Sequence, residues 1–277
     1  MVFNKVVKML LFISESPSSL LSVIVFFLTW AGLWLPIAVV SAIALQWRPS
    51  EPLKTQKLPL LASLYLIAPI VLWETNRLTG ASFSDYGVSW DLWTLRSLGI
   101  GLSLGVLSLT VLFAVQTALG WVTWQPIDKR QLASVLLPTL LIALLVSVIE
   151  EIVFRGFLLT QLRQDYSVEL AAAISSLIFA LLHLVWEQKE TIPQLPGLWL
   201  MGMVLVLARY LDGGSLGLAW GLHSGWVWVI ASLDTAQMVS YTGIGSEWVT
   251  GKNGKPLAGV AGILCLLATG SILLMLV

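Results

Sequence analysis

Two adjacent carboxylates and an arginine occur inside a long apolar segment, and these residue types are suited to acid–base catalysis. Glu150, Glu151 and Arg155 lie within residues 132–158, whose other side chains are mostly aliphatic. An ionisable group inside the hydrocarbon core of a membrane costs about 2.5–3.5 kcal/mol on insertion scales, so each one is by default a functional-site hypothesis. The alternative, a helix that ends here at the lipid headgroups, is disfavoured because the apolar run continues from Phe157 onward.

The helical period separates the roles of the two glutamates. Glu151 and Arg155 are four positions apart, so on an α-helix they share a face and can form an ion pair. Glu150 is rotated by about 100° from Glu151 and by about 140° from Arg155. We therefore expect Glu150 to stay outside the ion pair. Two carboxylates in different environments are the usual basis for separate acid and base roles.

Both histidines of the chain lie in other apolar segments. His183 falls in residues 169–187 and His223 in residues 215–234. A single histidine in a buried helix is usually a structural hydrogen-bonding group, but two of them together with a free glutamate favour a function. At about 1.5 Å of rise per helical residue, Glu150 and both histidines reach intramembrane depths from one side of the bilayer. We expect the three side chains to converge.

Glycines at helical spacing predict where two of these helices pack. They recur every fourth residue from Gly217 to Gly225, which makes one smooth face of small residues. Gly101 and Gly105 repeat the same spacing in an earlier apolar segment. His223 points away from the glycine face, so we expect it to face a cavity.

The composition places all these residues in an integral, multi-pass membrane protein. Of the 277 residues, 57% are hydrophobic and 11% are charged, against about 25% charged in an average soluble domain. The mean hydropathy is +0.89. Fifteen basic and fifteen acidic residues give zero net charge, which argues against nucleic-acid binding. A single cysteine, Cys265, excludes an intramolecular disulfide.

The elements that must position these residues are membrane helices. Eight segments approach the roughly 20 apolar residues that span a bilayer: 19–47, 58–75, 97–121, 132–158, 169–187, 195–211, 215–234 and 257–277. We therefore predict an all-α fold, a polytopic membrane helix bundle of about eight transmembrane helices. One membrane-embedded domain covers residues 1–277, with the candidate site in about 130–235. The first twelve residues fit an interfacial helix.

The candidate residues resemble the three motifs of a known family. Glu150-Glu151-x-x-x-Arg155, Phe179-x-x-x-His183 and then His223 are similar, in order and spacing, to the motifs of the CAAX-processing and bacteriocin-processing intramembrane endopeptidases, the CPBP or ABI family. The resemblance covers about residues 130–235, and the remaining segments fit the family's eight-helix fold in number only.

The resemblance implies an activity and a role for each residue. The reaction is hydrolysis of a peptide bond near the C-terminus of a lipid-anchored or hydrophobic substrate. Glu150 resembles the base that activates water. His183 resembles the residue that helps to position or protonate the reacting groups. Glu151 and Arg155 correspond to a supporting pair, and His223 to a residue that stabilises the oxyanion. Membrane lipids and a membrane-associated protein or peptide are the partners implied.

One position departs from the family pattern. The third motif usually carries Asn or Asp four residues after its histidine, and here that position is Val227. Valine cannot donate a hydrogen bond, and losing an oxyanion donor typically costs about 10²–10³ in rate. Trp226, on nearly the same helix face as His223, is a candidate for oxyanion support through its indole N–H.

Three alternatives remain open from the sequence. Glu150, His183 and His223 could form a zinc site with an open water position, although no cofactor is firmly implied and a metal-free site is favoured. A non-catalytic membrane scaffold or bacteriocin-immunity role is favoured by Val227. A proton-coupled transporter would also use intramembrane carboxylates and histidines, but the two halves of the chain show no repeated hydropathy pattern.

Overall fold

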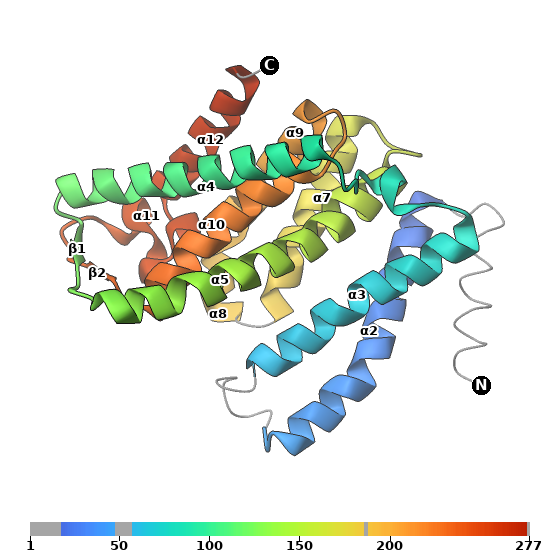
Figure 1. Ribbon diagram of the computed structural model, residues 1–277, viewed down its shortest axis with the longest axis horizontal. Coiled ribbons are helices and arrows are strands. Elements are labelled where there is room, and N and C mark those ends of the chain that lie inside the picture. Colours follow the sequence, from blue (N-terminus) through green and yellow to red (C-terminus); the bar gives the residue numbers. More distant parts are fainter. Residues whose placement is uncertain (1–17, 48–56, 186–187, 276–277) are drawn as a thin grey trace.

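The computed structural model describes residues 18–47, 57–185 and 188–275, and most of them are helical (Figure 1). The predicted interfacial helix within the first twelve residues lies outside these ranges. The α-helices are α2 (Ser19–Ala44), α3 (Lys57–Thr79), α4 (Leu92–Ala118), α5 (Lys129–Glu150), α6 (Leu159–Leu162), α7 (Val168–Leu182), α8 (Gln188–Thr191), α9 (Leu195–Leu211), α10 (Gly217–Thr235), α11 (Glu247–Thr250) and α12 (Val260–Met275). The shorter elements are the 3-10 turns η1 (Phe83–Tyr86), η3 (His183–Val185), η4 (Ile192–Gln194), η5 (Lys252–Gly254) and η6 (Pro256–Ala258), and the π-helix η2 (Glu151–Leu158).

All eight predicted membrane segments contain helix, and the chain is a polytopic helical bundle. Within the described ranges, six helical segments are both long and apolar enough to cross a membrane: Ser19–Ala44, Pro59–Thr79, Leu92–Ala118, Lys129–Leu162, Val168–Val185 and Gln188–Leu211. Helix α10 has 19 residues but is not one of the six, and α12 has only 16. Length and composition therefore leave the predicted count of eight unconfirmed.

A short sheet departs from the predicted all-helical fold. Strands β1 (Val122–Trp124) and β2 (Val239–Tyr241) pair antiparallel, with Val122 opposite Tyr241 and Trp124 opposite Val239. Because β1 follows α4 and β2 follows α10, the pairing fastens one end of these two helices together (Figure 1).

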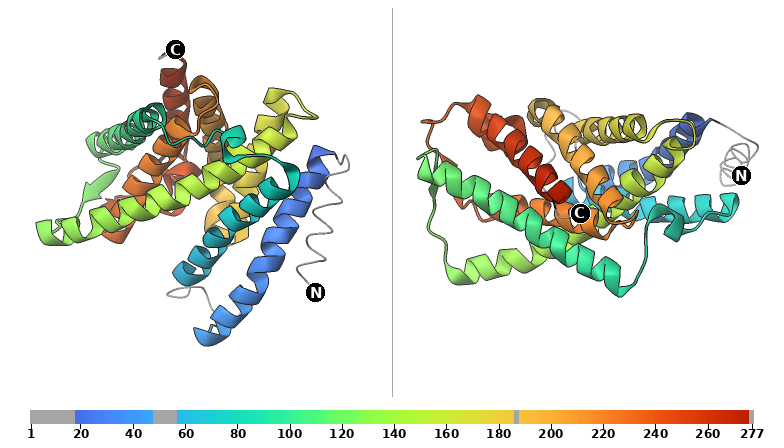
Figure 2. Two further views of the ribbon diagram at one scale, coloured as in Figure 1. Left: turned by 45° about the vertical axis from the view of Figure 1, so that its right-hand side comes forward. Right: turned by 90° about the horizontal axis from the view of Figure 1, so that it is seen from above.

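Helix α10 runs between α4 and α5, and its glycines set how closely it meets α4 (Figures 1 and 2). A Cβ atom added at Gly221 would collide with the carbonyl oxygen of Leu98, and one added at Gly225 would lie 2.6 Å from that of Leu102. On the facing helix, Gly105 lies against the backbone of α10 in the same way. The predicted glycine face is confirmed, and its partner is the second glycine pair.

Helices α2 and α3 form an antiparallel pair beside the group formed by α4, α5 and α10 (Figure 2). The indole N–H of Trp30 donates to the carbonyl oxygen of Leu64 over 2.9 Å, which joins the two helices. Phe26 packs against Phe157 of η2 with ring centroids 4.5 Å apart, which joins the pair to the helix that carries the glutamates. This packing brings one face of α3 to the candidate site.

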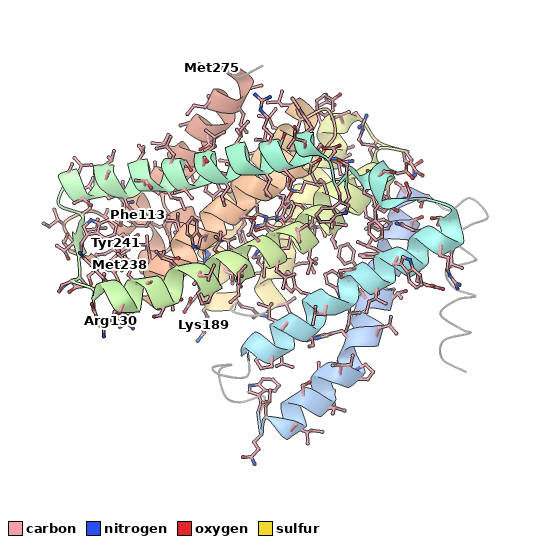
Figure 3. The ribbon with its side chains drawn as sticks, in the orientation of Figure 1. Phe113, Arg130, Lys189, Met238, Tyr241 and Met275 are labelled. Carbon is pink, nitrogen blue, oxygen red and sulfur yellow. The ribbon has the colours of Figure 1, made fainter. Side chains whose placement is uncertain are left out.

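The start of α5 and the end of α12 lie on different sides of the bundle. In Figure 3, Arg130 near the start of α5 and Lys189 on α8 lie below the level of α10, and Met275 at the end of α12 lies at the top.

Candidate active site

A π-helical segment carries the cluster of charges. The chain is helical without a break over Lys129–Leu162, but its hydrogen bonding changes at Glu151, where η2 begins. π-Helical segments are rare and often occur at functional sites. The sequence predicted only an α-helix over residues 132–158, because a π-helix leaves no composition or periodicity that distinguishes it from an α-helix.

Glu151 and Arg155 form a fully buried ion pair. Arg155 Nη1 lies 3.1 Å from Glu151 Oε1, and both side chains are 0% exposed. The guanidinium also lies over the ring of Phe179, 4.3 Å from its centroid. The predicted pairing of these two residues is therefore present, and it is shielded from bulk solvent.

His223 connects the two glutamates. Its Nδ1 lies 2.8 Å from Glu151 Oε1, and its Nε2 lies 3.5 Å from Glu150 Oε2. An ionised carboxylate only accepts hydrogen bonds, so a hydrogen bond between His223 and an ionised Glu151 requires a proton on Nδ1 of His223. In a neutral imidazole, Nε2 is then an acceptor that faces another acceptor, Glu150. The two groups must share a proton or hold a water molecule between them.

Glu150 is held by a residue that the sequence analysis missed. The hydroxyl of Tyr65, on α3, donates a hydrogen bond to Glu150 Oε1. Glu150 is 7% exposed and contacts Tyr65 and His223. The only sequence signal for Tyr65 is a hydroxyl within the apolar segment 58–75. No spacing relates that hydroxyl to the motif residues.

His183 lies at the end of α7, where the 3-10 turn η3 begins. Its Nδ1 is 2.8 Å from the carbonyl oxygen of Phe179, so Nδ1 is the protonated nitrogen and Nε2 is left as an acceptor. The ring of Phe179 also packs edge-on against His183 and His223, at 4.6 Å and 6.0 Å between centroids. One phenylalanine therefore positions both imidazoles and the guanidinium.

Two cavities meet at Glu150. Cavity 1, of about 520 Å³, lies between α2, α3, α5, η2 and α7, and its wall is almost entirely apolar. Cavity 2, of about 420 Å³, lies between α3, α4, α5, α9, α10 and α12 and carries more polar surface. Tyr65, Glu150 and His183 line both cavities, and His223 lines cavity 2. The predicted convergence of Glu150 with both histidines takes the form of a shared cavity wall, with direct contact only to His223.

The residues near the third motif differ from expectation at one position. Trp226 does not offer its indole N–H to the site, because Nε1 donates to Ser108 Oγ on α4 over 2.9 Å. Its ring lines cavity 2, beside Val227. The position that carries Asn or Asp in the resembling family therefore opens onto the same cavity as His223, with a side chain that cannot donate a hydrogen bond.

The residues do not fit the alternative zinc site. Within the described ranges, no group of three His, Cys, Asp or Glu side chains is arranged to hold a metal ion. Nδ1 of each histidine is directed to another protein acceptor, an arrangement that metal-bound histidines also have, so only the spacing of the side chains disfavours the zinc site.

Comparison with known proteins gives one match. Residues 132–229 match the family described as type II CAAX prenyl endopeptidase Rce1-like. The matched region contains Glu150, Glu151, Arg155, His183 and His223, and Tyr65 lies outside it. No curated protein and no solved structure matches the chain.

Proposed function

We propose that this chain, whose residues 132–229 carry an Rce1-like domain of the CAAX protease family, is an intramembrane endopeptidase. Its substrate is lipid-anchored or otherwise hydrophobic, and the bond it hydrolyses lies near the substrate's C-terminus. The observation that carries this proposal is the place of Glu150, which lines both cavities and is flanked by two histidines whose tautomers are fixed by the protein.

Glu150 is the general base in this proposal. A water molecule at the junction of the cavities loses a proton to Glu150 while its oxygen attacks the carbonyl carbon of the scissile bond. Nε2 of His183, left free as an acceptor, orients that water from the other side of the junction. Tyr65 holds Glu150 Oε1, so the second carboxylate oxygen faces the reacting atoms and His223.

His223 completes the proton transfers. The proton taken by Glu150 passes to Nε2 of His223, and the negative charge of Glu151 stabilises the resulting imidazolium through Nδ1. The imidazolium then donates a hydrogen bond to the oxyanion, and its proton finally goes to the leaving amine when the C–N bond breaks. Arg155 balances the negative charge of Glu151 within the buried site.

The test is cleavage of a hydrophobic, lipidated peptide by purified protein in detergent. Glu150→Gln keeps the shape of the side chain and removes the base, so cleavage falls by about 10²–10⁴-fold. Glu247→Gln is the matched control, because Glu247 is exposed on α11 and lines neither cavity. Equal loss in both variants, or cleavage retained in Glu150→Gln, contradicts the proposal.

A second candidate function is a non-catalytic membrane scaffold or immunity protein. It is favoured by Val227, which places an apolar side chain in the cavity wall where the family pattern has a donor. The same assay separates the two functions: a scaffold cleaves no peptide in either the parent or the Glu150→Gln variant.

A further inference from the structure

Cavity 2 has a cation in its wall that the proposed chemistry does not use. Among the described residues that line it, Lys255 is the only lysine or arginine, and the formally negative ones are Glu150 and Glu190. Lys255 precedes η6, and its ammonium lies 3.1 Å from Asp234 Oδ2, at the C-terminal end of α10. A cation in the wall of a substrate cavity is suited to bind an anion of the substrate.

The loop that carries Lys255 is built rigidly. Gly251 has a φ of +117°, and a Cβ atom there would collide with the carbonyl oxygen of Lys255. Gly262 of α12 allows the same close approach to Pro256, and Gly254 lies against the ring of Tyr241, which is labelled in Figure 3. Close backbone contacts at glycines before and after Lys255 in the chain thus hold the backbone of this residue in place.

The ion pair with Asp234 leaves Lys255 able to bind a second anion. An ammonium has three donors, and Asp234 accepts from one of them. The Asp234 side chain is 57% exposed and that of Lys255 is 31% exposed. Ion pairs this exposed contribute little to stability, so adding a second carboxylate, or exchanging Asp234 for it, costs the fold little.

The distance from the reacting groups matches a short peptide. One face of α10 lines cavity 2 from His223 through Val227 to Ala231, and Asp234 follows on the next turn. His223 and Asp234 are eleven positions apart, which is about 17 Å at 1.5 Å per residue. An extended peptide covers at most about 3.3–3.6 Å per residue, so at least about five residues are needed to span the two points.

We infer that Lys255 binds the free C-terminal carboxylate of the substrate peptide in cavity 2, and so places the scissile bond of an extended peptide about five residues from the chain end. The inference rests on the proposed endopeptidase function and names what fixes the position of cleavage. The peptide's last residues lie along α10 between His223 and Lys255, with their side chains against the apolar part of the wall.

Peptide binding tests this inference without requiring cleavage. In the Glu150→Gln background, a fluorescent hydrophobic peptide with a free carboxylate is compared with the same peptide ending in an amide. We expect the carboxylate form to bind about tenfold more tightly, the gain typical of one charge-assisted hydrogen bond. Lys255→Met removes that preference, and Lys252→Met, an exposed lysine of the same loop, keeps it.

Asp234→Asn separates recognition from a structural role. If Lys255 binds the carboxylate, Asp234→Asn frees its donors and preserves or increases the preference for the free carboxylate. If Lys255 only fastens its loop to α10, Lys255→Met and Asp234→Asn act alike, and neither changes the ratio between the two peptides. Equal affinity of both peptides for the protein with Lys255 intact also overturns the inference, independently of any variant.

Cleavage by the protein with Glu150 intact distinguishes this failure from that of the proposed function. A carboxylate preference without cleavage overturns the endopeptidase and leaves the binding site. Cleavage at equal rates for both peptides, and for peptides extended by ten residues beyond the scissile bond, overturns the binding site and leaves the endopeptidase.

Discussion

The hydroxyl of Tyr65 donates a hydrogen bond to the carboxylate of Glu150, although the two residues are 85 positions apart in the chain. Tyr65 lies on α3, outside the region that matches the CAAX protease family. The helix pair α2–α3 is therefore part of the site, because it supplies one wall of cavity 1 and a hydrogen bond to the proposed base.

Tyr65→Phe is expected to lower the cleavage rate. Without the hydroxyl, one oxygen of Glu150 loses its donor and the carboxylate is free to rotate, so we expect kcat to fall about tenfold with KM nearly unchanged. Tyr210→Phe, on an exposed tyrosine of α9, is the matched control. Steady-state kinetics on both variants check the prediction, and an unchanged kcat in Tyr65→Phe would remove Tyr65 from the site.

Arg155→Met is expected to destabilise the protein strongly. It leaves the Glu151 carboxylate buried without its cation, and breaking a buried pair in this way costs about 3–5 kcal/mol. The double variant Glu151→Gln with Arg155→Met removes both charges, so much of that stability returns.

Activity separates the double variant from the parent. His223 Nδ1 loses its anionic acceptor in the double variant, so we expect cleavage to stay low even where stability recovers. Thermal unfolding in detergent and the peptide assay are measured on the same samples. Full activity in the double variant would show that Glu151 has a structural role only.

Gly221→Ala is expected to separate α4 from α10. The added methyl group meets the carbonyl oxygen of Leu98, and overpacking of this kind costs about 1–3 kcal/mol. Cleavage falls as well, because α10 carries His223. Gly99→Ala on α4 is the control: nothing lies within 4 Å of its added Cβ, so thermal unfolding shifts little or upward.

Val227→Asn is expected to raise the rate of an active enzyme. The amide N–H₂ would enter cavity 2 beside His223 and supply a hydrogen-bond donor for the oxyanion, worth up to about a hundredfold in kcat. Val227→Leu changes the size of the side chain without adding a donor and serves as the control. A parent that cleaves, with no gain in Val227→Asn, would show that the position lies outside the oxyanion site.

Periodic features of the sequence predicted much of the fold and part of the site. The eight apolar segments all contain helix, the Glu151–Arg155 pair forms, and the glycines of α10 pack against a neighbour. Each of these depends on residues a few positions apart or on the composition of one segment, so a single helix determines it. The motif residues also indicated the family, which the match over residues 132–229 confirms.

Three features could not be predicted in this way. The indole N–H of Trp226 donates a hydrogen bond to Ser108 on another helix. The helix face on which Trp226 lies did not indicate that this N–H is unavailable to the site. The π-helix η2 begins at Glu151 without a local sequence signal. The short β1–β2 sheet pairs residues more than 100 positions apart, where turn composition alone predicts only loops.

The sequence by itself determined the candidate residues for the chemistry, because a charge inside an apolar segment is recognisable from composition alone. Only the tertiary structure decided what each of them contacts: Tyr65 at Glu150, His223 between two glutamates, and Lys255 in the wall of cavity 2. The physical reason is that helix period fixes the direction of a side chain on its own helix. Which neighbour it meets depends on the close packing of helices that are remote in sequence, and small residues such as Gly221 set that packing.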